Sequence, residues 1–135
     1  PVQRHYLDLS WREKTERKEI MSYDKDNWAV PTGLSRKARK LAHAIVKLAK
    51  KRDWSSGGQK VFWSPKEWKN KGEPYGCGSE LIILHEGGDH APFFSLDYSS
   101  YAGSYDQYEE QSKFLQSHGF WIEGIYTWSS AIYES

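Results

Sequence analysis

The chain has 135 residues, of which 38% are hydrophobic, 27% are charged and 16% are aromatic, and its formal net charge is +1. This size and composition are typical of a single globular domain, and no apolar run approaches the ~20 residues that a membrane-spanning helix needs, so we expect a cytoplasmic protein without membrane contact. Cys77 is the single cysteine, which excludes an intramolecular disulfide and a zinc site built from several thiolates.

The N-terminal quarter of the chain predicts an extension that precedes the main domain. A short strand at 2–9 and a polar helix at 11–23 are expected there. We therefore expect residues 1–33 to form an N-terminal helical extension and residues 34–135 to form a compact domain.

Residues 36–52 predict an amphipathic helix with a basic outer face. Ser35 is a suitable N-cap, and six small or aliphatic residues recur at the spacing of one buried stripe. That stripe consists of Ala38, Leu41, Ala42, Ile45, Leu48 and Ala49. No acidic residue occurs between Ser35 and Asp53. The opposite arc is therefore entirely cationic, polar or neutral.

The middle of the chain predicts strands with one short helix between them. A strand is expected at 60–63, and the N-cap and proline of Ser64-Pro65 predict one or two helical turns. A buried strand is expected at 80–86, followed by a hairpin turn and a return strand at 90–97 that Pro92 confines to an edge.

The C-terminal segment predicts a helix and then two strands. The helix is expected from Tyr105 to Gly119, where glycine ends it, and the strands at 120–126, with a bulge at Gly124, and at 128–133. The complete pattern predicts an α+β fold, with a small, mostly antiparallel sheet of three to five strands and two main helices on one face.

The charges of the chain are unevenly distributed. Residues 1–70 hold 17 Lys and Arg against 8 Asp and Glu, whereas residues 71–135 hold 2 against 10. The two halves either neutralise each other by packing together or form two charged poles that steer partners. This alternative decides whether the basic arc is available to a ligand.

The basic arc is the main candidate for a binding surface. Clustered cations on one helix face match a phosphate backbone, and their neutralisation of phosphates gives affinity that does not depend on sequence. The candidate nucleic-acid-binding residues are Arg36, Arg39, Lys40, His43, Lys47, Lys50 and Lys51.

Aromatic side chains suggest two further surfaces. Rings on the strands could stack unpaired bases, although alternation along a strand sends half of them into the core. The eight rings considered are Phe62, Trp63, Trp68, Phe93, Phe94, Trp121, Tyr126 and Trp128. A protein-binding surface could instead use the acidic, aromatic residues Trp121, Tyr126, Trp128, Glu109 and Glu110.

Two weaker patterns concern metal binding and catalysis. In the expected hairpin His85 and His90 would face each other, and Asp89 could complete a metal site with them. Cys77 lies in a glycine-rich loop and becomes a nucleophile only if a histidine lowers its pKa.

These patterns support three hypotheses in order. The first is a non-catalytic protein that contacts nucleic acid or a nucleoprotein complex through the basic helix, with no cofactor. The second is an inhibitor or adaptor that binds a basic protein partner, such as a nucleic-acid enzyme. The third is a small enzyme that depends on a metal or on Cys77 and histidine.

Overall fold

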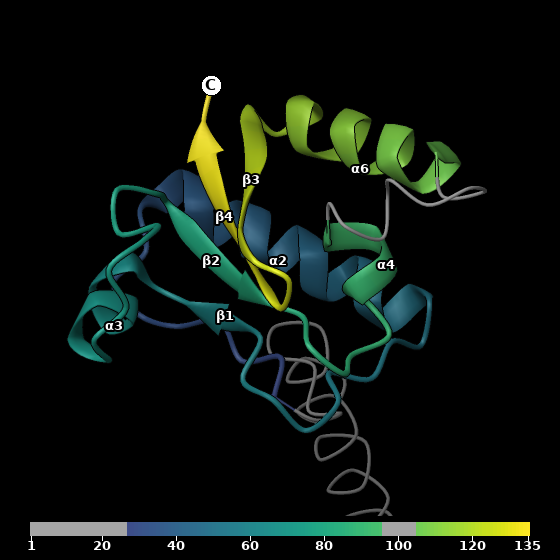
Figure 1. The fold of residues 1–135 in the computed structure, drawn as a ribbon. Coiled ribbons are helices and arrows are strands. Elements are labelled where there is room, and N and C mark those ends of the chain that lie inside the picture. The colour runs from purple at the N-terminus through teal and green to yellow at the C-terminus, as the bar shows by residue number, and fades with distance from the viewer. Residues whose placement is uncertain (1–26, 96–104) are drawn as a thin grey trace, which may run out of the picture.

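The computed structural model describes residues 27–95 and 105–135, so the strand expected at 2–9 and the helix expected at 11–23 lie outside the described residues. Figure 1 shows the arrangement of the described elements. In chain order they are α2 (Arg36–Lys51), β1 (Phe62–Trp63), α3 (Pro65–Asn70), β2 (Leu81–Leu84), α4 (Ala91–Phe94), α6 (Tyr105–Ser117), β3 (Phe120–Tyr126) and β4 (Ser129–Glu134).

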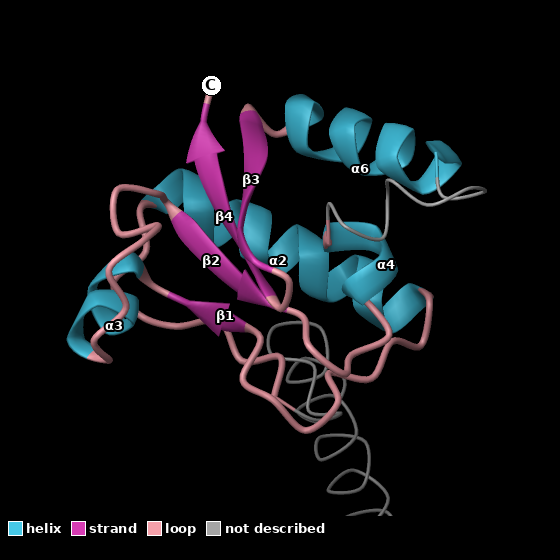
Figure 2. Ribbon diagram, in the orientation of Figure 1, coloured by secondary structure: helices cyan, strands magenta, loops and turns pink. Residues whose placement is uncertain are grey.

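The four strands form one antiparallel sheet in the order β1-β2-β4-β3 (Figure 2). β2 is central, and it pairs along its whole length with β4, from Leu81 opposite Ile132 to Leu84 opposite Ser129. The prediction of an α+β fold with a small antiparallel sheet is confirmed.

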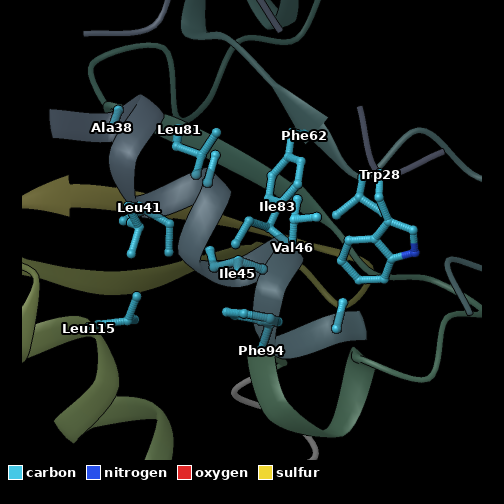
Figure 3. Close-up of a cluster of buried hydrophobic side chains, with 14 of the residues drawn as sticks. Trp28, Ala38, Leu41, Ile45, Val46, Phe62, Leu81, Ile83, Phe94 and Leu115 are labelled. Atoms are coloured by element: carbon cyan, nitrogen blue, oxygen red, sulfur yellow. The ribbon is translucent and has the colours of Figure 1, made fainter. Parts of the chain in front are cut away.

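Side-chain alternation along β2 divides the core into two clusters. Leu81 and Ile83 join a large cluster with the buried stripe of α2 (Figure 3), whereas Ile82 and Leu84 join a smaller cluster with Trp68 of α3. Because successive strand residues point to opposite faces, α2 and α3 cover opposite faces of the sheet.

The sequence of α2 explains both its start and its orientation. The side chain of Ser35 accepts a hydrogen bond from the backbone N–H of Ala38 at 3.1 Å, which satisfies one donor of the first turn. Its buried residues are Ala38, Leu41, Ala42, Ile45, Val46 and Ala49. The predicted helix is confirmed.

The core extends upstream of α2. The side chain of Trp28 is fully buried in the large cluster, where its ring meets that of Phe62 edge to face. Asn27 forms an isolated β-bridge with Lys60. Residues that precede Leu34 therefore pack with the sheet and with α2.

The short helix α3 forms as its sequence predicts. Ser64 and Glu67 exchange hydrogen bonds in a capping box, with Glu67 N–H donating to Ser64 Oγ at 3.1 Å and Ser64 N–H donating to Glu67 Oε1 at 3.0 Å. Pro65 occupies the start of the helix, where a missing N–H has no cost.

The hairpin expected after β2 is wrong. The chain turns after His85 and continues into α4, with Pro92 in the first turn of that helix instead of in an edge strand. The edge of β2 that the return strand would use is occupied by β4. A backbone hydrogen bond of 2.8 Å from Asp89 N–H to Ser55 O ties the turn to another loop. Residues 96 and 97 lie outside the described part.

The C-terminal elements agree with the sequence pattern. The helix α6 ends before Gly119, which has a φ of 84°, a conformation that glycine adopts without steric cost. The register between β3 and β4 shifts between Gly124 and Tyr126, as the expected bulge requires. α6 adds Leu115 to the large cluster.

Candidate nucleic-acid interface

The predicted basic arc lies on the exposed side of α2. Six of the seven candidate side chains are exposed and His43 is half-buried. The six are Arg36, Arg39, Lys40, Lys47, Lys50 and Lys51. The helix buries its other side against the sheet, so packing against the sheet leaves the arc uncovered.

Two ion pairs connect this helix region to the acidic half of the chain. Lys37 Nζ lies 2.9 Å from Glu134 Oε1 near the N-terminal end of α2, and Arg52 pairs with Glu110 at the C-terminal end. Neither cation is among the seven candidates. Within residues 27–95 and 105–135, no carboxylate forms an ion pair with Arg39, Lys40 or Lys47.

The dimensions of the arc suit an extended polyanion. With a rise of 1.5 Å per residue, Arg36 and Lys51 lie ~22 Å apart along the axis. At ~100° per residue, the arc from Arg39 to Lys37 covers about 160° of the helix surface. A duplex carries one phosphate per ~3.4 Å of each strand, so several phosphates fit within this length.

α6 runs beside α2 in the opposite direction. The Arg52–Glu110 pair joins the end of α2 to the first half of α6. At the other end, Lys37 and Lys40 of α2 share a cleft with His118, which follows α6. Sequence reasoning missed this contribution from α6, although the absence of acidic residues between Glu110 and Gly119 was a signal for it.

The eight aromatic rings divide between the core and the surface. Four of them are buried, namely Phe62, Trp68, Phe93 and Phe94. Trp63, Tyr126 and Trp128 are half-buried beside the smaller cluster, and Trp121 is 45% exposed. None of the surface rings belongs to α2, so the basic arc has no stacking platform of its own.

A lysine occupies the tryptophan-rich surface near α3. The Nζ atom of Lys71 lies 4.8, 4.7 and 5.6 Å from the ring centroids of Trp63, Trp68 and Trp128. Cation–π attraction of this kind stabilises the fold and covers the rings.

The residues predicted to bind a protein are not all in one place. Tyr126 stacks on Trp128 with a centroid distance of 4.8 Å near α3, whereas Trp121 stacks on Tyr133 at the far end of the β3–β4 pair. Glu110 is engaged with Arg52, and Glu109 is exposed beside it on α6.

The three predicted metal ligands do not converge. His85 and His90 are buried with ring centroids 6.5 Å apart, and Asp89 Oδ2 accepts a hydrogen bond of 2.9 Å from Ser55 N–H. In the described ranges no three His, Cys, Asp or Glu side chains form a group that could hold a metal ion.

The environment of the two histidines favours their neutral forms. Burial lowers the pKa of His85 to about 4, with repulsion from His90 as a second cause. Burial also lowers the pKa of His90, against the opposing effect of the hydrogen bond from its ring to the carbonyl of Leu84.

Cys77 has a structural partner. Its thiol donates a hydrogen bond of 3.2 Å to the carbonyl of Glu73, and the side chain packs half-buried against the smaller cluster.

Comparisons with other proteins add no functional assignment. Across the described residues, no helix has the length and apolar character to cross a membrane. No protein-family model, no curated protein and no solved structure matches the chain.

Proposed function

We propose that this protein is a non-catalytic nucleic-acid-binding protein that contacts the phosphate backbone through the basic arc of α2. The observation that carries this proposal is the exposure of the arc. The acidic half of the chain pairs with Lys37 and Arg52 near the two ends of the helix, and the cations between them face outward.

Phosphate contacts explain what such a surface would do. Each lysine or arginine that neutralises a phosphate releases counterions, so affinity falls steeply as the salt concentration rises. Contacts of this kind position a protein on nucleic acid without reading its sequence. We therefore expect binding with little sequence preference.

A mobility-shift assay over a salt series tests the proposal. The double substitution Lys40→Glu and Lys47→Glu should weaken binding at least about tenfold and reduce the salt slope by about 2, because two phosphate contacts are lost. The matched control is Lys66→Glu with Lys69→Glu, which makes the same charge change on exposed residues of α3, across the sheet.

Two outcomes would reject the proposal. One is the absence of binding to single-stranded or double-stranded DNA or RNA at about 50 mM salt, where electrostatic affinity is high. The other is equal weakening by the α2 and α3 double variants, which would show that only the net charge matters.

A second candidate function is the docking of a basic protein partner on the exposed face of β3 and β4. The stacked pair of Trp121 and Tyr133 favours it, since exposed aromatic rings beside the carboxylate of Glu123 suit lysine or arginine side chains. Affinity capture with the natural chain and with Trp121→Ala, after nuclease treatment, tests this candidate. A partner that both proteins retain equally would contradict it.

A further inference from the structure

The cleft between α2 and the end of α6 combines side chains that suit an oxyanion. It encloses about 470 Å³ and is lined by Lys37, Lys40 and Ala44 from α2 and by Ser117 and His118 from the end of α6. All the titratable side chains of this lining are basic. An anion in the cleft would therefore meet cations on both walls.

Lys37 is held at the mouth of the cleft. Its Nζ atom lies 2.9 Å from Glu134 Oε1 and 5.5 Å from the ring centroid of Phe120. It also lies against Gly119, where a Cβ atom would come within 2.8 Å of Nζ. An ammonium group has three donors, so Lys37 can keep Glu134 and still donate to an oxygen inside the cleft.

Lys40 faces the same cleft one turn further along α2. It is exposed and forms no ion pair with any carboxylate of the described residues. Its charge is therefore available to a ligand. Lys113, which is exposed one helical turn before Ser117 on α6, adds positive charge on the other side.

His118 is oriented by its own helix. Its Nδ1–H donates a hydrogen bond of 2.9 Å to the carbonyl of Phe114, and its ring packs on the Phe114 ring with centroids 4.9 Å apart. This hydrogen bond places the proton of the neutral ring on Nδ1. Nε2 is then the nitrogen that gains a proton, and it becomes a donor when it does.

Anion binding and protonation of His118 are therefore coupled. The charged groups that face this region are Lys37 and Lys40 of α2, with Glu134 of β4 behind Lys37. Two ammonium groups disfavour a third positive charge in the empty cleft, and a bound anion reverses that effect. Binding should thus tighten as the pH falls.

We infer that this cleft is a phosphate-binding site in which Lys37, Lys40 and protonated His118 hold one phosphate group. The identity of its carrier, a phosphodiester of a nucleic-acid backbone, rests on the proposed function. The arc on α2 then continues across the cleft to α6, and the nucleic acid contacts two helices at this end.

NMR of the His118 ring in the natural chain tests the site with inorganic phosphate alone. Phosphate should shift the His118 resonances and move its titration midpoint to higher pH, relative to chloride at equal ionic strength. The variant Lys40→Gln should lose most of this response, whereas Lys66→Gln on α3 should keep it. An unchanged His118 signal in phosphate would overturn the inference.

Nucleic-acid binding by two His118 variants tests the carrier. The natural chain should gain affinity between about pH 8 and pH 6, and His118→Gln should reduce that gain about threefold. His118→Lys, which keeps a charge at every pH, should restore tight binding and remove the same share of the pH dependence.

The outcomes separate the two proposals. If His118 responds to phosphate and no nucleic acid binds, the proposed function fails and the phosphate site stands. If nucleic acid binds and both His118 variants behave as the natural chain does, the site in the cleft is wrong and the proposed function stands.

Discussion

His85 combines complete burial with a polar side chain on the central strand. Its side chain is 1% exposed, and its Nε2–H donates to Ser130 Oγ at 3.0 Å while the Ser130 hydroxyl donates to the carbonyl of Phe94 at 3.2 Å. This chain of hydrogen bonds requires the proton on Nε2. Nδ1 has no partner, so a second proton on this ring would be buried without compensation.

The first prediction concerns stability against pH. Because the pKa of His85 is about 4 in the folded chain and near 6.5 when unfolded, the unfolded state takes up the proton first as the pH falls. Stability should therefore be constant with respect to this residue above about pH 6.5 and should have fallen by about 2 kcal/mol at pH 5. His90, whose pKa is also lowered, should add a loss of the same sign.

Urea unfolding at a series of pH values measures this effect. His85→Gln, which keeps a side-chain N–H donor, should make the decline between about pH 7 and pH 5 distinctly shallower. His43→Gln on the outer side of α2 should leave the slope as it is. A His85→Gln slope equal to that of the natural chain would exclude His85 as the cause.

The second prediction contrasts neighbouring glycines in one turn. Gly57 and Gly58 have φ values of 74° and 79°, but a Cβ atom on Gly57 would lie 2.4 Å from the carbonyl oxygen of Gly87, whereas one on Gly58 would meet nothing within 4 Å. Gly58→Ala should cost about 1 kcal/mol of stability from backbone strain. Gly57→Ala should cost at least about 2 kcal/mol more, because rigid backbone must move.

Denaturant unfolding of the two alanine variants checks this contrast. Equal losses would show that the loops at Gly57 and Gly87 separate at little cost.

At the scale of elements, the capping box of α3 gives the third prediction. Ser64→Ala removes the acceptor for Glu67 N–H and should lower the free energy of unfolding by about 1 kcal/mol. Ser35→Ala at the start of α2 is the matched variant, because Ser35 makes the equivalent bond to Ala38. Chemical denaturation followed by circular dichroism measures both; a loss for Ser35→Ala alone would show that α3 does not depend on its cap.

Elements with local signals were predictable from the sequence. α2, α3 and the end of α6 each carry an N-cap, a proline or a terminal glycine within a few residues, and all three appear where expected. The segment 90–97 shows the limit of this reasoning. Gly87-Gly88 favours a hairpin locally, but β4, some 40 residues later in the chain, takes the partner edge of β2.

The candidate site was predictable in part for the same reason. Helical periodicity places the arc residues on one side of α2, but their exposure depends on where the acidic side chains of distant elements lie. Glu110 and Glu134 are positioned by tertiary packing and pair with Arg52 and Lys37 only. The contribution of His118 to the cleft depends on the packing of α6 beside α2, which no local pattern encodes.

At the scale of the whole molecule, the burial of Trp28 gives the fourth prediction. A fragment that begins at residue 34 lacks this side chain, which fills space beside Phe62 and His90 in the large cluster. Removing a buried tryptophan costs about 3–5 kcal/mol, a large share of the stability of a domain this size.

Thermal unfolding of fragments 27–135 and 34–135 compares the two starting points directly. The shorter fragment should melt at a lower temperature or fail to fold, and Trp28→Ala in the full chain should show a similar loss. Equal melting temperatures for the two fragments would contradict a structural role for Trp28.

The sheet order has a consequence for behaviour at high concentration. β3 is an edge strand of seven residues, long enough to recruit a strand from another molecule. The register shift between Gly124 and Tyr126 bends this edge, and the exposed carboxylate of Glu123 adds charge beside it. Concentrated samples should consequently resist edge-to-edge aggregation, and straightening the bulge by deleting one residue there should make the protein prone to fibril formation.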